Sequence, residues 1–208
     1  VTATNTSGNT WTAVYTGNTN DSNGAITFSI AFSDLYGNPG TAVTSGSGSV
    51  TFDKTPPSMT ITATEVNDGD SSNNSSITLL FTSSEATTNF ISTDIVVSGG
   101  SLSNFGATSS TVYTAIFTPS SAGATTINVA AGVFNDATGN PNTIAGEFNW
   151  TYDNVVPTMT ITSSTVSSGS TTNDSSIALT FTSSEVTTDF VVGDITVTNG
   201  VISNFSGS

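Results

Sequence analysis

Apolar residues alternate with Ser and Thr over most of this chain, which is typical of β-strands that bury one face. Clusters of Asn, Asp, Gly and Pro separate the alternating segments at the short spacing of an antiparallel β-sandwich. Residues 112–117 also predict a strand, but apolar residues occupy both parities there and leave its inward face open. The residues expected in the core are Ile61, Leu79, Phe81, Ile95, Val97, Val129 and Trp150.

The chain repeats itself at a fixed offset of 100 residues. Residues 57–108 align with residues 157–208 without a gap, and 27 of these 52 residue pairs are identical. A repeat of this size indicates an array of similar domains. The segments that recur unchanged are MTIT (59–62), FTSSE (81–85) and SNF (103–105).

The alignment predicts one complete unit between two half units. Residues 55–155 form the complete unit, residues 1–54 resemble the late half of a unit, and residues 156–208 resemble an early half. Proline-containing linkers join the units, so the connections should be short, extended and stiff. The motifs that identify the late half are GNP at 37–39, which matches 139–141, and TFD at 51–53, which matches TYD at 151–153.

The motifs of the complete unit resemble the bacterial immunoglobulin-like repeats of large secreted adhesins and surface fibres. The segments that carry the resemblance are TPPSMTIT, ITLLFTSSEATTNFISTDIVVSGGSLSNF, VYTAIFTP, VAAGVFNDATGNPNT and FNWTYD. The C-terminal half follows this pattern closely, whereas residues 1–54 diverge, with SDLYGNPG in place of NDATGNPN. The resemblance implies an all-β fold of tandem immunoglobulin-like antiparallel β-sandwich domains, one complete and two half units.

The same resemblance implies an extracellular or cell-surface protein that acts as a structural repeat of an adhesin stalk or surface fibre. Two alternatives stay open: a binding module whose loops hold carbohydrate or another ligand, and an accessory domain of a carbohydrate-active enzyme. Interchangeable loops favour the structural role, because NDGD (67–70) is replaced by SSGS (167–170) in the next unit.

The composition removes several classes of function. Fifteen acidic residues stand against one basic residue, Lys54, so nucleic acid and anionic membranes would be repelled. The chain has no His and no Cys, which excludes imidazole bases, thiolate nucleophiles, disulfides and ordinary zinc sites. We therefore expect no enzymatic activity. No run of 18 apolar residues is present, and residues 1–10 lack the features of a signal peptide, so no membrane insertion is expected.

Eight of the acidic residues fall in matched pairs between units, and they have two interpretations. In one, each carboxylate accepts N–H bonds and stabilises a turn. In the other, carboxylates near the linkers bind calcium and stiffen the array, although no EF-hand loop is present. The calcium candidates are Asp53, Asp153, Asp136, Glu85 and Asp94, and no other cofactor is expected.

Ser and Thr make up 75 of the 208 residues, which also has two interpretations. Thr is favourable on the solvated face of strands, and a dense hydroxyl surface offers many sites for covalently attached glycans. Trp150 is expected in the core; the alternative is a sugar-stacking platform with Trp11 and Tyr113. The N-linked sequons begin at Asn5, Asn20, Asn73, Asn74, Asn149, Asn173 and Asn204.

Each half unit alone would leave an apolar sheet face and an open edge in water. We therefore expect the C-terminal half to be completed head-to-tail by residues equivalent to 1–54 of a neighbouring copy or repeat. The join is either covalent within one long polypeptide, which we favour, or a non-covalent strand complementation between copies. The strands expected in the two halves are 1–4, 11–16, 26–32 and 49–52, and 159–163, 177–182, 195–198 and 201–205.

Overall fold

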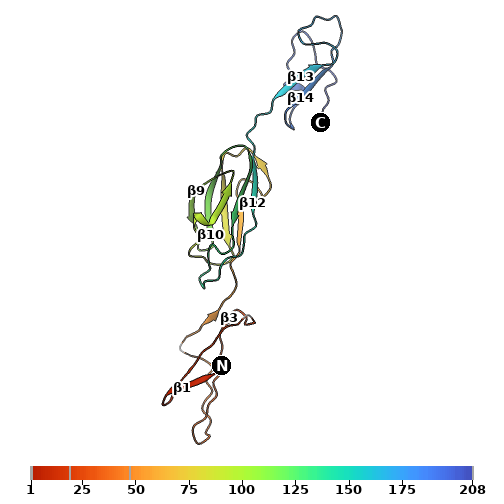
Figure 1. The fold of residues 1–208 in the computed structure, drawn as a ribbon. Helices are drawn as coiled ribbons and strands as arrows, with labels where there is room; N and C mark the ends of the chain where they lie inside the picture. Colours follow the sequence, from red (N-terminus) through yellow and green to blue (C-terminus); the bar gives the residue numbers. More distant parts are fainter. Residues whose placement is uncertain (1, 19, 47, 208) are drawn as a thin grey trace. The chain divides into compact units, whose positions relative to one another are not determined.

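The computed structural model describes residues 2–18, 20–46 and 48–207, and the chain divides into two compact units, residues 1–153 and 154–208 (Figure 1). Val1 and Ser208, the outermost residues of the expected half units, lie outside the described residues. The described residues contain strands and two short 3₁₀ helices, η1 (Ser92–Asp94) and η2 (Val192–Asp194), so the expected all-β class is confirmed.

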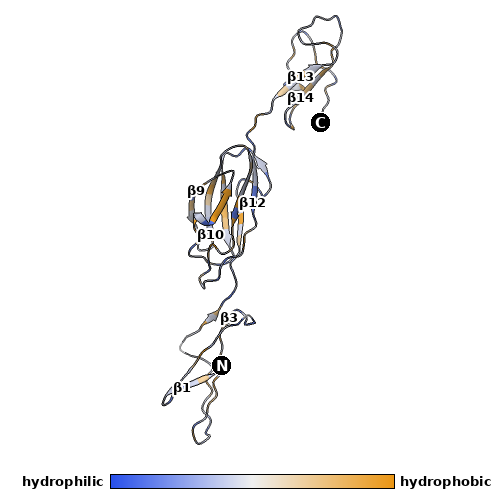
Figure 2. Ribbon diagram, in the orientation of Figure 1, coloured by the Kyte–Doolittle hydropathy of each residue, from blue (hydrophilic) through white to orange (hydrophobic). Residues whose placement is uncertain are grey.

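Two four-stranded sheets pack together within the first unit and form the complete sandwich. All neighbours pair antiparallel except β6 (Ser71–Ser72) and β12 (Phe148–Tyr152), which pair parallel. Figure 2 shows hydrophobic and hydrophilic residues mixed along the strands, as expected for sheets with one buried face. The first sheet has the order β5 (Met59–Ala63), β7 (Ile77–Ser83), β10 (Val112–Pro119), β9 (Gly100–Ala107). The second has the order β6 (Ser71–Ser72), β12 (Phe148–Tyr152), β11 (Gly123–Val129), β8 (Ile95–Ser98).

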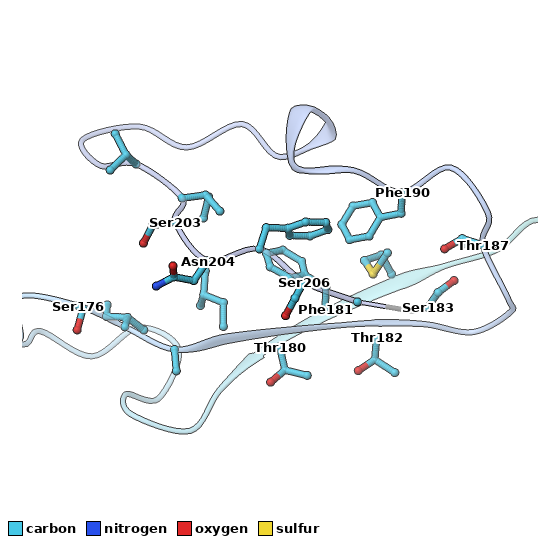
Figure 3. Close-up of a pocket in the computed structure, with 18 of the residues that line it drawn as sticks. Ser176, Thr180, Phe181, Thr182, Ser183, Thr187, Phe190, Ser203, Asn204 and Ser206 are labelled. Carbon is cyan, nitrogen blue, oxygen red and sulfur yellow. The ribbon is translucent and has the colours of Figure 1, made fainter.

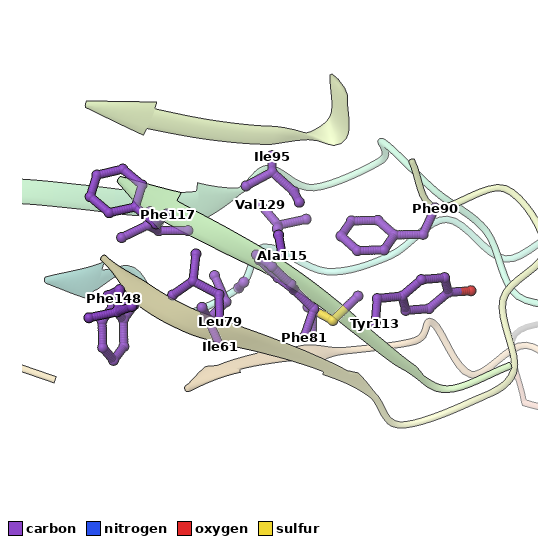
Figure 4. Close-up of a cluster of buried hydrophobic side chains, with 14 of the residues drawn as sticks. Ile61, Leu79, Phe81, Phe90, Ile95, Tyr113, Ala115, Phe117, Val129 and Phe148 are labelled. Atoms are coloured by element: carbon purple, nitrogen blue, oxygen red, sulfur yellow. The ribbon is translucent and has the colours of Figure 1, made fainter. Parts of the chain in front are cut away.

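The core contains the residues that the alternation predicted (Figure 4). Six of the seven are buried, and Val97 is half-buried against the same cluster. The structure also decides the inward face of β10, since Tyr113, Ala115 and Phe117 are buried.

One ring from a loop, that of Phe90, packs against aromatic rings of the first sheet and of a second loop. Phe90 is 3% exposed, and its ring centroid lies 5.0 Å from that of Tyr113 and 5.2 Å from that of Phe134, both in edge-to-face geometry. Phe105 and Phe81 complete this aromatic cluster at 5.6 Å and 5.8 Å. Such pairs add specific attraction to the apolar area that they bury.

Residues 1–54 form two short antiparallel pairs. β1 (Ala3–Ser7) pairs with β2 (Thr10–Ala13), and β3 (Gly24–Ala25) pairs with β4 (Thr51–Phe52). The strand expected at 26–32 is not formed; a single bridge joins Ile30 to Val43. In the complete sandwich the corresponding strand β11 lies between two partners, and only one of those partners has a counterpart within residues 1–54.

The second unit contains β13 (Met159–Ser163) paired with β14 (Leu179–Ser183). The strands expected at 195–198 and 201–205 are not formed. Their counterparts β8 and β9 pair with β11 and β10, which belong to the late half of a unit. These segments therefore lack the backbone groups with which a sheet ladder would form.

Replacing Phe81 by Ala should lower the free energy of unfolding of the complete sandwich by about 3–5 kcal/mol, because the side chain is fully buried and a cavity would remain. Denaturant unfolding of the full chain measures this change. Val96→Ala is the control, since Val96 is 63% exposed on β8 and its truncation should have little effect. A loss below about 1 kcal/mol for Phe81→Ala would contradict the central place of this ring.

Candidate functional site

The most distinctive surface of the second unit is an open groove of about 1420 Å³. It runs along β14 and the segment 201–207, and Figure 3 shows Phe181 and Phe190 among the side chains that line it. Two of its aromatic contacts reproduce those of the complete sandwich. The Phe181–Phe190 centroids are 5.8 Å apart at 56°, as Phe81–Phe90 are 5.8 Å apart at 55°, and Phe190–Phe205 lie at 5.4 Å.

The groove exposes side chains whose counterparts form the core of the complete sandwich. Met159 is 40% exposed and Ile177 is 43% exposed, whereas Met59 and Ile77 are 4% and 1% exposed. Leu179 is 42% exposed, although its counterpart Leu79 is not exposed at all. The groove is therefore the inner face of a sandwich that lacks its late strands.

The second unit keeps the local contacts of the early half of the complete sandwich. In η2, Asp194 accepts an N–H bond from Val191 at 2.9 Å, and in η1 Asp94 accepts the same bond from Ile91 at 2.9 Å. Asp94, one of the calcium candidates, therefore serves locally as a cap in this structure, as the turn interpretation expects. Around Phe190, the groove lacks the rings equivalent to Tyr113 and Phe134, which belong to late elements.

The missing rings have counterparts in residues 1–54. The segment WTAVYT (11–16) matches YTAIFT (113–118) at an offset of 102, and β1 pairs Asn5 with Trp11 as β9 pairs Ala107 with Tyr113. Trp11 is 63% exposed, although Tyr113 is buried. This match was not among the motifs that identified the late half from sequence, because it lies at an offset of 102 and the main repeat lies at an offset of 100.

The remaining turns of residues 1–54 keep the backbone register of the complete unit. Gly40 donates its N–H to the carbonyl of Phe32 at 2.8 Å, as Asn142 donates to Phe134 at 2.9 Å. This equivalence places Phe32, which is 56% exposed, at the position of the buried Phe134. Residues 1–54 therefore carry an unburied copy of the late strands and rings that the groove lacks.

A second candidate site lies at the linker that precedes the complete sandwich. Carboxylate oxygens of Asp53, Glu85 and Asp136 all lie within 4.8 Å of one another. The structure thus brings together three of the five calcium candidates. Asp153 lies after β12, where its N–H donates to Ser72, and it does not join this cluster.

The pKa values of Asp136 and Glu85 in this acidic cluster are shifted in opposite directions. Burial opposes the charge of Asp136, but hydrogen bonds from the side chain and backbone of Asn140 and from Thr138 outweigh it and lower the pKa of Asp136 to about 2. Desolvation, and then the like charges of Asp53 and Asp136, raise the pKa of Glu85. The cluster therefore concentrates negative charge, which hard oxygen-seeking cations such as Ca²⁺ would neutralise.

Three neutral side chains connect this cluster to its surroundings, and sequence reasoning missed them. Asn23 donates to Asp53 Oδ1 at 2.8 Å. Asn140 donates to the carbonyl of Asp53 at 3.3 Å and to Asp136 Oδ2 at 2.8 Å, and the Thr138 hydroxyl lies 3.5 Å from Asp53 Oδ2. The available signal was the Asn of GNP, which recurs at Asn38 and contacts Asp34 in the same way.

The turn interpretation of Asp136 also has a direct structural basis. Its Oδ1 accepts the N–H groups of Thr138 at 2.8 Å and Asn140 at 2.9 Å, and Asp34 Oδ1 accepts two equivalent bonds. These contacts stabilise the turn locally. The calcium hypothesis stays a prediction.

The glycosylation candidates are mostly accessible. Six of the sequon asparagines are exposed and Asn74 is half-buried. Trp150 is 1% exposed and donates its Nε1–H to Ser72 Oγ at 3.1 Å, which places it in the core. The exposed asparagines are Asn5, Asn20, Asn73, Asn149, Asn173 and Asn204.

Residues 53–152 match the family described as bacterial Ig-like domain, so the expected resemblance is confirmed. Domains of this family are typically structural modules, often of extracellular or cell-surface proteins. Comparisons with curated proteins and with solved structures found no match to the chain. Within the part of the chain that the structure describes, no helix has the length and apolar character needed to span a membrane.

We expect calcium to raise the thermal unfolding temperature of the full chain modestly, because binding to the native cluster stabilises by mass action. Scans with calcium and with chelator measure this shift. Glu85→Gln should stabilise the chelated protein at pH 7, since it removes a carboxylate whose pKa is raised, and it should reduce the gain from calcium. An unchanged unfolding temperature in calcium would leave only the turn role of these residues.

Acid should weaken the Asp136 turn in a defined window. The folded-state pKa of Asp136 is about 2, below its ordinary value of 3.8, so its contribution is present above pH 3.8 and is lost as the pH falls towards 2. Between pH 5 and about 2, the free energy of unfolding should therefore fall more steeply with decreasing pH for the natural chain than for Asp136→Asn. The same pH dependence in both proteins would show that protonation of Asp136 is not coupled to folding.

Proposed function

We propose that this chain is a structural tandem-repeat subunit of an extracellular adhesin stalk or surface fibre, joined head-to-tail and glycosylated. The observation that carries the proposal is the pair of incomplete halves. The second unit exposes residues that are buried in the complete sandwich, and residues 1–54 hold the missing rings. Halves of this kind are complementary to one another and generate an open-ended chain when the contact is head-to-tail.

The rest of the surface supports a structural role. Ser and Thr dominate the exposed faces, and the described residues hold no cluster of His or Cys, since the chain lacks both. The aromatic side chain that could have formed a sugar platform in the complete unit, Trp150, is in the core. A spacer requires only a stable sandwich and a defined connection to the next one, and the Asp53 linker contacts supply such a connection.

Native material should contain assemblies much larger than one chain. Denaturing electrophoresis then distinguishes the two joins: a band at 21.0 kDa plus any glycan indicates non-covalent complementation, and a far larger band indicates one long polypeptide. A native protein that is monomeric in solution, with both halves folded within their own chain, would contradict the fibre.

Glycans should add mass to each 21.0 kDa chain, because the exposed surface is rich in hydroxyl groups and sequon asparagines. Intact mass spectrometry of native material measures the addition, and treatment with a glycosidase should reduce it. The fold should survive deglycosylation, since the core contains no sugar-dependent contact. A native mass equal to that of the polypeptide would overturn this part of the proposal.

A further inference from the structure

We propose that the first linker, residues 53–57, is protected from proteases that cut after basic residues, because the contacts that hold it also occupy the groups that such a protease needs. Lys54 is the only Lys or Arg among the 208 residues, so the Lys54–Thr55 peptide bond is the single site that these proteases can cut. Both residues are exposed, and exposed connecting segments are preferred sites of cleavage. The protection therefore comes from hydrogen bonds rather than from burial.

The backbone of the first linker already has partners within the chain. A protease binds the segment around the cleaved bond as an extended strand and forms hydrogen bonds with its backbone. Here the N–H of Lys54 donates to Asn23 Oδ1 at 3.1 Å, and the N–H of Thr55 donates to Asp53 Oδ1 at 3.0 Å. The next two residues are prolines, which have no N–H to offer.

The side chain of Lys54 is held as well. Its Nζ donates to the carbonyl of Asp21, in the loop before β3. The Asp21 carboxylate orders this loop, because it accepts the N–H of Asn18 at 2.8 Å and the Tyr15 hydroxyl at 2.8 Å. These bonds from Asn18 and Tyr15, and then the charge of Lys54, lower the pKa of Asp21. A protease that recognises a basic side chain must first withdraw the ammonium group from this loop.

The amide of Asn23 contacts the linker on both sides of the bond that would be cut. Its Oδ1 accepts the N–H of Lys54, and its Nδ2 donates to Asp53 Oδ1 at 2.8 Å and to Thr55 Oγ1. Asn23 lies 31 residues before Lys54 in the sequence. It can therefore be changed without altering the residues that a protease reads around the bond.

The complete sandwich fixes the linker from its other side. Asn140 donates to the carbonyl of Asp53 at 3.3 Å, and the N–H of Thr143 donates to the carbonyl of Pro57 at 2.9 Å. Pro57 itself is fully buried. A protease needs residues on both sides of Lys54 in its cleft, so cleavage requires the linker to open locally.

The second linker, residues 153–157, lacks both the basic residue and the side chain that holds it. Asn154 stands where the first linker has Lys54. β3 pairs with β4 in the register that β11 has with β12, which places Ala122 at the position of Asn23. The basic residue and its amide partner thus occur together in one linker and are replaced together in the other, as expected if they act as a unit. All of these contacts lie within one chain, so the protection does not depend on contacts between copies.

Digestion with trypsin measures this protection directly, since one bond is available and the products are residues 1–54 and 55–208. A synthetic peptide of residues 49–60, which has the same sequence around Lys54 without the contacts, serves as the reference substrate in the same reaction. The natural chain should be cut at least about tenfold more slowly than the peptide, because it is cut only while the linker is open. Equal rates for the chain and the peptide would overturn the proposal.

Asn23→Asp should speed cleavage of the chain roughly tenfold, because the new carboxylate cannot donate to Asp53 and repels it. The matched control is Asn38→Asp, since Asn38 donates to Asp34 Oδ2 at 2.8 Å in the same half and away from the linker. This control should change the rate less than about twofold. Equal acceleration by both substitutions would show that general opening of residues 1–54 controls cleavage, and it would overturn the linker contacts as the cause. An unchanged rate for Asn23→Asp would overturn them too.

Discussion

The structure depends on one packing constraint: the apolar faces of the sandwich are buried only when early and late strands are both present. Phe90 shows this most directly. Its ring contacts Phe81 and Phe105 from the early half and Tyr113 and Phe134 from the late half. A half unit keeps the early contacts and leaves the other side of the ring without partners, so its apolar surface stays in contact with water.

The same constraint governs the backbone. A strand in the middle of a sheet is hydrogen-bonded on both sides, and removing one neighbour exposes a row of N–H and C=O groups. This accounts for the short ladders at both ends of the chain, where β13 and β14 pair but the segment 195–198 does not. Strand formation there is limited by missing partners rather than by the local sequence, since Ile195 and Val197 alternate as Ile95 and Val97 do.

The sequence predicted the fold class and most of the core of the sandwich because period-two alternation reports directly on burial. It could not decide the face of β10, since Val112, Ala115 and Ile116 offer apolar groups on both sides and only tertiary packing selects Tyr113 and Phe117. It also omitted Phe90 and Phe134 from the core, because both lie in loops where no periodicity reveals burial. For the acidic cluster, the matched pairs indicated candidate residues. The sequence could not show that Asp53, Glu85 and Asp136 lie together, because they belong to three loops that are far apart along the chain.

The acidic cluster joins the linker to the folded sandwich. Asp136 belongs to a late turn, Glu85 follows an early strand, and Asp53 belongs to the linker, so the cluster forms only when a sandwich is complete and its preceding linker is in place. Asn140 bridges the Asp53 carbonyl and the Asp136 carboxylate, and it thereby ties the position of the linker to the folding of the late turn. Completion of a sandwich and definition of its connection to the preceding segment are consequently a single event. In an array of such units, each linker would therefore be fixed in place when the domain that follows it closes.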